Sequence, residues 1–173
     1  MGIRNYLIDG VSCSGKTTVA TALARRGHHV IHGDRVLARR GDPKTGAPLD
    51  KAQERDDPAW RHAHHIWPLD RVAALCTDSA HPVTFFCGGA RNSHQFLALF
   101  DRIFVLALDR QTLIDRLATR PADEFGATPA ERALILRLHE TGEDLPAGAT
   151  LVDATLPLAQ VVDAILQGCR LET

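Results

Sequence analysis

The chain has 173 residues, of which 45% are hydrophobic and 24% charged, a composition typical of one globular domain rather than of a disordered segment. Twenty lysines and arginines oppose 21 aspartates and glutamates, so the net charge of -1 gives no electrostatic case for a nucleic-acid or acidic-membrane partner. No apolar run approaches the roughly 20 residues of a membrane helix, and the N-terminal run is too short for a signal peptide. Four widely spaced cysteines predict reduced thiols in a cytoplasmic protein.

In the first third of the chain, short apolar runs alternate with segments whose apolar residues have the spacing of a helix. Residues 3–9 are predicted to form a buried strand, and residues 15–26 carry apolar side chains at the spacing of a helix. A second strand is expected at 28–32, followed by a brief helix at 34–40. Residues 41–58 are rich in glycine, proline and charge, which predicts a mobile loop.

The rest of the chain continues this alternation. One helix is expected from Ala59 to about Cys76, and a second polar loop at 121–129. Three strands and four helical segments are predicted, in chain order, at 81–87, 92–99, 101–108, 110–119, 131–140, 149–153 and 158–167. Five strands that alternate with helices predict an α/β fold in which a parallel sheet is covered on both faces. The functional site of such a sheet lies at the carboxyl ends of its strands.

A phosphate-binding motif follows the first strand. The segment Gly10-Val11-Ser12-Cys13-Ser14-Gly15-Lys16-Thr17 matches Gly-x-x-x-x-Gly-Lys-Ser/Thr between a predicted strand and a predicted helix. Glycines let the backbone curl around a phosphate, and its amides form an anion-binding nest at a helix N-terminus. Lys16 adds a charge for the β- and γ-phosphates, and the Thr17 hydroxyl can ligate Mg²⁺. We expect nucleotide contacts from Gly10, Ser12, Cys13, Ser14, Gly15, Lys16, Thr17 and Thr18.

The short chain, the early phosphate loop and the five strands resemble the small P-loop kinases, which include nucleoside monophosphate kinases, shikimate kinases and gluconokinases. The resemblance implies a three-layer P-loop NTPase fold in one domain, 1–173, with a parallel sheet in the order 2-3-1-4-5. It implies a substrate cap at about 41–80 and a lid at about 120–131. It also implies ATP and Mg²⁺ as cofactors and a small-molecule phosphate acceptor as partner, with the oligomeric state open between monomer and homodimer.

Asp34 follows the second strand in the segment His32-Gly33-Asp34-Arg35. At this position a carboxylate can orient or deprotonate an acceptor hydroxyl, or hold Mg²⁺ together with Thr17. The alternative is a helix N-cap, and both roles can hold at once. Arg35 is a further candidate for contact with the acceptor. The turn that follows lacks both the arginine of the adenylate kinases and the histidine of the gluconokinases.

Gly88, Gly89 and Arg91 follow the third strand. The glycines allow close approach of a ligand, and the arginine can fork onto a phosphate or a carboxylate. The segment is similar to the arginine-ending segment of adenylate kinases and to the corresponding segment of gluconokinases. The alternative is a turn with a solvated arginine. No acidic residue follows this strand, where many P-loop proteins hold Mg²⁺.

Arg116 and Arg120 lie four residues apart and therefore on one helix face. They match the arginine pair at the entry to the lid of the small kinases. The resemblance implies that one lies against adenine and that the other neutralises the transferring phosphate. The alternative is a solvated basic face, and Arg132 and Arg137 are weaker candidates for the same roles.

The predicted cap carries the segments Gly46-Ala47-Pro48-Leu49 and Pro58-Ala59-Trp60, which are similar to elements of gluconokinases. Trp60 and Trp67 either stack on a ligand or pin a cap helix. Three nearby histidines lack a carboxylate or thiol at ligand spacing, so we expect a solvated helix face rather than a metal site; they are His62, His64 and His65.

These features together predict an ATP-dependent kinase that transfers the γ-phosphate to a nucleoside or sugar-acid hydroxyl. Lys16, Asp34, Arg116 and Arg120 are the expected catalytic residues. Two alternatives stay open: a nucleoside monophosphate kinase, and a nucleotide-binding regulator without a small-molecule acceptor.

Overall fold

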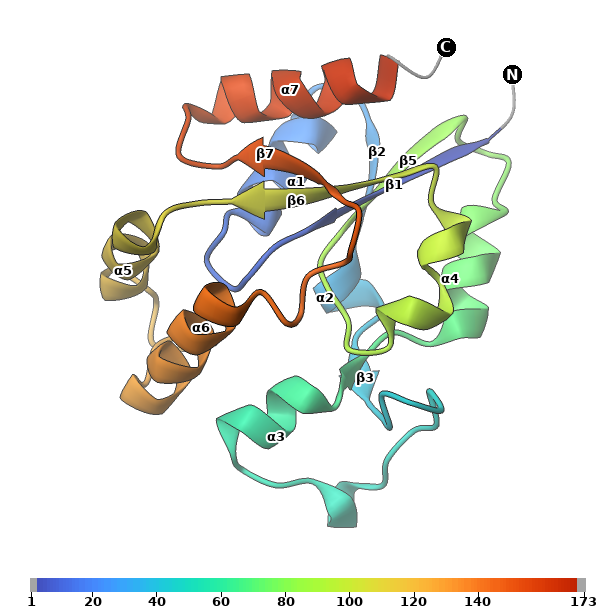
Figure 1. Ribbon diagram of the computed structural model, residues 1–173. Helices are drawn as coiled ribbons and strands as arrows, with labels where there is room; N and C mark the ends of the chain where they lie inside the picture. The colour runs from blue at the N-terminus through green and yellow to red at the C-terminus, as the bar shows by residue number, and fades with distance from the viewer. Residues whose placement is uncertain (1–2, 171–173) are drawn as a thin grey trace.

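A parallel five-stranded sheet forms the centre of the computed structural model, which describes residues 3–170 (Figure 1). Its strands lie in the order β2-β5-β1-β6-β7. Their bounds, in chain order, are β1 Arg4–Asp9, β2 His29–His32, β5 Val83–Cys87, β6 Arg102–Ala107 and β7 Thr150–Asp153. Numbered along the chain, this is the order 2-3-1-4-5, so the predicted P-loop topology is confirmed. None of the helices within residues 3–170 has the length and apolar character that crossing a membrane requires.

Successive residues of the central strands pack into two different layers, because side chains alternate between the faces of a sheet. On one face Tyr6 and Ile8 pack with side chains of α1 (Lys16–Arg25) and α7 (Leu158–Arg170). On the other face Leu7 packs with α4 (Leu69–Cys76) and the neighbouring loops. Figure 1 shows α7 and α1 on one side of the sheet and α4 on the other. Both faces are therefore buried, as a parallel sheet requires.

Two helices lie beyond the carboxyl ends of β6 and β7. Helix α5 (Arg110–Ala118) is capped by Asp109, and α6 (Pro129–Thr141) begins with a capping box formed by Thr128 and Glu131. Leu113 and Leu117 of α5 pack on Ile135 of α6 in a separate small core. The predicted lid segment connects the two helices (Figure 1).

The segment between β2 and β5 differs from the prediction in two places. The expected helix at 59–76 is wrong: α3 (Pro58–Ala63) ends before β4 (His65–Ile66), and α4 begins only at Leu69. Pro68, the N-cap of α4, cannot donate a helical hydrogen bond and favours an extended residue before it, which separates α4 from the preceding segment. The pairing of β4 with β3 takes His65 and Ile66 out of the helix. The expected helix at 34–40 is also too long.

Helix α2 (Gly33–Val36) forms a single turn, and the chain then extends into β3 (Arg39–Arg40), which pairs antiparallel with β4. The predicted loop at 41–58 holds a bridge between Gly41 and Pro48 and a short 3-10 helix, η1 (Lys51–Gln53). The segment predicted as helical at 92–99 consists of two 3-10 turns, η2 (Ser93–Gln95) and η3 (Leu97–Leu99).

Trp67 fixes the backbone on which the site is built. Its ring is fully buried, and a Cβ added at Gly33 or Gly88 would lie 2.1 or 2.6 Å from the ring carbon Cζ2. The Asn92 side chain accepts from the Trp67 amide at 3.0 Å and donates to its carbonyl at 2.7 Å. Of the two roles considered for Trp67, packing is therefore the one that the structure supports.

Candidate active site

The loop between β1 and α1 has the shape that its glycines permit. Gly15 has a φ of 107° and Cys13 a φ of 68°, and a Cβ at Gly10 would meet the Ser14 Oγ at 2.5 Å. The first helical amides of α1 face outward without intrahelical partners, as at every helix N-terminus. Lys16 Nζ donates to the carbonyl oxygens of Gly10 and, at 3.0 Å, Val11. The loop, the helix end and the lysine together form a positive cradle for phosphate.

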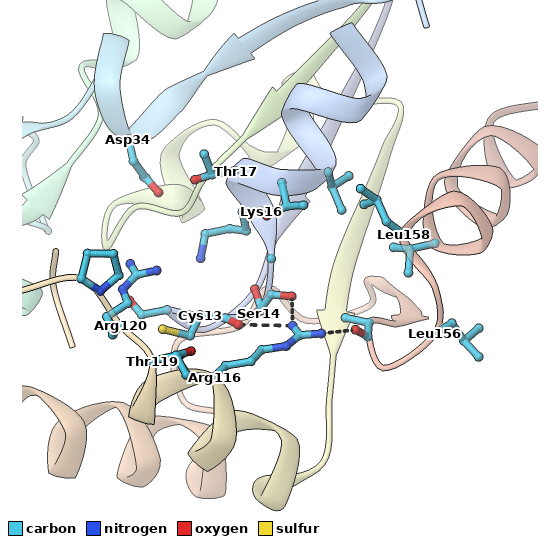
Figure 2. A pocket seen from close by; sticks show the side chains of 17 residues that line it. Cys13, Ser14, Lys16, Thr17, Asp34, Arg116, Thr119, Arg120, Leu156 and Leu158 are labelled. Carbon is cyan, nitrogen blue, oxygen red and sulfur yellow. Dashed lines mark hydrogen bonds between the residues drawn. The ribbon is translucent and has the colours of Figure 1, made fainter. Parts of the chain in front are cut away.

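Arg116 joins the phosphate loop to the segment after β7. Its guanidinium donates to the carbonyls of Cys13 at 3.3 Å, Ser14 at 2.9 Å and Ala154 at 2.6 Å, as the dashed lines in Figure 2 show. A cavity of about 500 Å³ opens here, within the size range of small-molecule sites. Its walls combine residues 12–19 with Arg116, Thr119, Arg120, Pro121, Ala154, Leu156, Leu158, Val161 and Asp34. Arg116 is thus a wall of the cavity and not part of a solvated face.

A second cavity, of about 680 Å³, lies between the phosphate loop, α2, α3 and α6. The sequence-predicted residues Asp34, Arg35, Gly89 and Arg91 line it. Gly88 lies behind this wall, against the Trp67 ring. The two cavities share six lining residues, which are Ser12, Lys16, Thr17, Thr18, Asp34 and Arg120.

Asp34 lies where the two cavities meet, and in Figure 2 its carboxylate points into the same space as Lys16 and Thr17. Its Oδ1 accepts from the Gly89 amide at 3.2 Å and lies 3.1 Å from His65 Nε2. Burial favours a raised pKa, but the His65 hydrogen bond and the Lys16 charge outweigh it and hold the pKa of Asp34 below 3.8. Asp34 is within α2 and caps nothing, so the N-cap alternative is wrong.

The expected solvated histidine face is also wrong. His65 lies on β4 beside Asp34, and His62 Nε2 lies 2.5 Å from Asp144 Oδ2. His64 stacks on Trp60, with 4.1 Å between the ring centroids. The pairing of β4 with β3 removes His65 from the helix, and helical periodicity in the sequence does not reveal that contact.

Asp9 is the functional candidate that sequence reasoning missed. It is the last residue of β1, is 2% exposed, and lines the second cavity. Burial raises the pKa of Asp9 to about 6, although Lys16, the Gly10 amide and Arg91 act in the opposite direction. The available signal was a carboxylate at the carboxyl end of an apolar strand, directly before the phosphate loop.

Arg61 and His62 of α3 line the second cavity and pair with α6 and with the segment that follows α6. Arg61 Nη2 lies 2.8 Å from Glu131 Oε1, and His62 pairs with Asp144, which also pairs with Arg91. Burial favours a raised pKa for Asp144, but the His62 hydrogen bond and the Arg91 charge lower it.

The remaining predicted arginines differ in position. Arg120 lines both cavities, donates from Nε to the Phe125 carbonyl at 3.1 Å and pairs with Glu124 at 2.8 Å. Arg132 donates to the Gly126 carbonyl at 3.0 Å, and Arg137 is an exposed partner of Glu143 at 3.8 Å. Neither of these two lines a cavity of the site.

Solved structures similar to this chain are kinases with the same fold. A gluconokinase from Sinorhizobium meliloti 1021 is 22% identical, with a TM-score of 0.54 over 97% of this chain and 93% of that one. A shikimate kinase from Acinetobacter baumannii in complex with shikimate is 16% identical, with a TM-score of 0.63 over 99% and 95%. A deoxyadenosine kinase from M. mycoides with bound dATP is 12% identical, with a TM-score of 0.52 over 95% and 98%. At sequence identities this low, the similarity establishes a shared fold and no more.

Sequence comparison identifies the family of the chain more closely than the shared fold does. No profile of a known protein family matches the chain. A gluconokinase from Gluconobacter oxydans (strain 621H) is 32% identical over 152 residues, which cover 83% of this chain and 79% of that protein. Together with the phosphate loop and the confirmed sheet order, this relative shows that the chain belongs to the gluconokinase family of small P-loop kinases and is an ATP-dependent small-molecule kinase.

Proposed function

We propose that this kinase transfers the γ-phosphate of ATP to a hydroxyl group of a sugar acid of the gluconate class. The observation that carries the proposal is the meeting of two cavities at Lys16, Thr17 and Asp34. One cavity has the cradle that a triphosphate needs, and the other has room and charge for an acceptor. Phosphoryl transfer depends above all on holding the two reactants in line and on neutralising charge between them.

On the nucleotide side, residues 10–18 bind the phosphates and Arg116 forms a wall beside the base, together with Leu156 and Leu158. Thr17 and Asp34 are the residues that would hold Mg²⁺, a cation that prefers oxygen ligands. The lowered pKa of Asp34 fits this role, because its carboxylate stays ionised throughout the neutral range. When bound, Mg²⁺ would neutralise phosphate charge.

On the acceptor side, the charge of the second cavity favours an anionic sugar. Arg40, Arg61 and Arg91 all line it. Arg61 and Arg91 have carboxylate partners, whereas Arg40 has no ion pair among residues 3–170 and donates to the Arg61 carbonyl at 2.8 Å. Burial and the neighbouring Arg61 charge lower the pKa of Arg40, so an acceptor carboxylate here would relieve an unfavourable environment. Arg35 and Gly89 complete the proposed acceptor contacts.

The predicted cap (41–80) and lid (120–131) are proposed to close over these cavities within a single domain. The Arg61–Glu131 ion pair joins the cap to α6, the helix that follows the lid, and His62 joins the cap to Asp144 beyond that helix. Arg120, which lines both cavities, is the proposed neutraliser of the transferring phosphate. The near-zero net charge gives no electrostatic support for a nucleic-acid or membrane partner. The widely spaced cysteines support a cytoplasmic enzyme, which we propose acts as a monomer or homodimer.

The test is ADP release from Mg·ATP across a panel of gluconate, other sugar acids, shikimate, nucleosides and nucleoside monophosphates. We expect a sugar acid to stimulate release in the wild type, and Lys16→Ala to lose the stimulation. Arg25→Ala, exposed in the last turn of α1, removes a cation outside both cavities and is the control that should retain wild-type rates. Stimulation by a nucleoside or a nucleoside monophosphate alone would refute the acceptor class. A flat panel despite tight ATP binding would instead favour a nucleotide-binding regulator.

A further inference from the structure

Asp9 is a buried carboxylate that accepts fewer hydrogen bonds than a buried charged group normally does. Its Oδ1 accepts from the Gly10 amide at 2.7 Å, and no other described donor hydrogen-bonds to either carboxylate oxygen. Buried charged groups in proteins are normally paired or multiply hydrogen-bonded, because burial without partners is unfavourable. A neutral asparagine could accept the same backbone bond, so the turn alone gives no reason for a carboxylate here. The second oxygen, Oδ2, has no hydrogen-bond partner among the described residues, and Asp9 lines the acceptor cavity.

Both carboxylates of the site line the acceptor cavity, but they differ on the nucleotide side. Asp34, like Thr17, also lines the nucleotide cavity, whereas Asp9 lines only the acceptor cavity. Gly89 lies between them: its amide donates to Asp34 at 3.2 Å, and a Cβ at this position would lie 2.3 Å from Asp9 Oδ1. The glycine therefore keeps the space beside Asp9 free of a side chain.

The surroundings of Asp9 agree with this geometry. The charged groups that face Asp9 are Lys16 of α1, Asp34 of α2 and Arg91 after β5. Burial and the Asp34 charge outweigh the two cations and the Gly10 amide, so the pKa of Asp9 rises to about 6. A base whose pKa lies near the working pH accepts a proton most effectively.

We propose that Asp9 is the catalytic base that removes the proton from the acceptor hydroxyl, while Asp34 remains the anion that orients this hydroxyl beside Thr17. In this step the acceptor O–H bond breaks and its proton moves to Asp9 Oδ2. The acceptor oxygen forms a bond to the γ-phosphorus as the bond from that phosphorus to the bridging oxygen breaks, and ADP leaves. Asp9 then loses the proton to solvent. The assignment rests on the proposed function, because it requires a hydroxyl acceptor.

The decisive variant is Asp9→Asn, which has the same shape and keeps an oxygen for the Gly10 amide. We expect kcat to fall by about 10²–10³-fold, within the usual range for loss of a general base. The Kd for ATP, titrated without acceptor, should stay within about two-fold of wild type. The wild-type kcat/KM should fall below about pH 6, and the variant should lack this acid limb. Asp163→Asn, exposed on α7 and lining neither cavity, is the control and should retain the wild-type profile.

Three outcomes would overturn the assignment. A kcat within about three-fold of wild type would show that Asp9 takes no proton. A parallel loss of ATP affinity would show that Asp9 only supports the phosphate loop. Recovery of the variant rate at high Mg²⁺ would show that Asp9 belongs to a metal site.

The experiment also separates this inference from the proposed function. If another hydroxyl compound replaces the sugar acid as acceptor, the same comparison is made with that compound. If no acceptor stimulates ADP release, the comparison is made on slow ATP hydrolysis, in which water occupies the place of the hydroxyl. An unchanged hydrolysis rate in Asp9→Asn would then overturn the role of Asp9, whatever the acceptor.

Discussion

The substitution Asp9→Asn is expected to stabilise the protein at neutral pH while it impairs catalysis. Asp9 is 2% exposed, and its pKa is raised from 3.8 to about 6 by burial. Each pKa unit corresponds to about 1.4 kcal/mol, so keeping this carboxylate ionised costs the folded state about 3 kcal/mol. Asparagine carries no charge and keeps the hydrogen bond from the Gly10 amide, so it removes this cost.

The pH dependence of this gain in stability follows from the direction in which the pKa of Asp9 is shifted. The folded state binds the Asp9 proton more tightly than the unfolded state does, so the wild type loses stability as the pH rises from about 4 to about 6. The full cost is present above about pH 6. The advantage of Asp9→Asn should therefore be near zero at pH 4 and reach about 3 kcal/mol at pH 8.

Urea unfolding at pH 4, 6 and 8 measures this difference directly, and thermal unfolding at pH 8 should show a Tm higher by roughly 6–12 °C for a chain of this size. Asp70→Asn, exposed on α4, serves as the control and should show no comparable pH-dependent gain. A variant no more stable than wild type at pH 8 would refute the reasoning, and so would an equal gain at pH 4 and pH 8. A functional residue that lowers stability is a common trade-off in enzymes.

Three further predictions concern the walls of the site. Arg116→Ala removes three hydrogen bonds that join the phosphate loop to Ala154, and we expect ATP affinity, measured by calorimetry, to fall by about 10–100-fold; unchanged affinity would contradict this. Arg40→Ala should raise the KM for the sugar acid by about 10–100-fold and leave the KM for ATP unchanged, since Arg40 lines the acceptor cavity and has no ion pair among residues 3–170; equal changes in both constants would argue against it. Gly33→Ala should lower the free energy of unfolding by about 1–3 kcal/mol in urea titrations, because the new Cβ would lie 2.1 Å from the Trp67 ring; wild-type stability would exclude this packing role.

The elements that depend on local sequence were predictable. The phosphate loop combines fixed glycines with a strand before it and a helix after it, and the structure contains both neighbours. The five strands were identifiable as apolar runs, and their order followed from the resemblance to small P-loop kinases. The helix expected at 59–76 failed because β4 is stabilised by pairing with β3, a contact that helical periodicity does not register.

The parts of the site that depend on distant contacts could not be predicted in the same way. His65 reaches Asp34 across 31 residues of sequence, and only the β3–β4 pairing brings it there. In sequence, Asp9 is one of several residues at strand ends. Only the folded chain places it beside Gly89 and in the wall of the second cavity.

The most direct test of the central claim is detection of the phosphorylated product by ³¹P NMR after incubation with Mg·ATP and gluconate. Wild-type protein should produce ADP and a phosphate monoester of the sugar acid in equal amounts, and Lys16→Ala should produce neither. ADP without a phosphorylated sugar acid, or equal product from the Lys16→Ala variant, would contradict a sugar-acid kinase whose two substrates meet at Lys16 and Asp34.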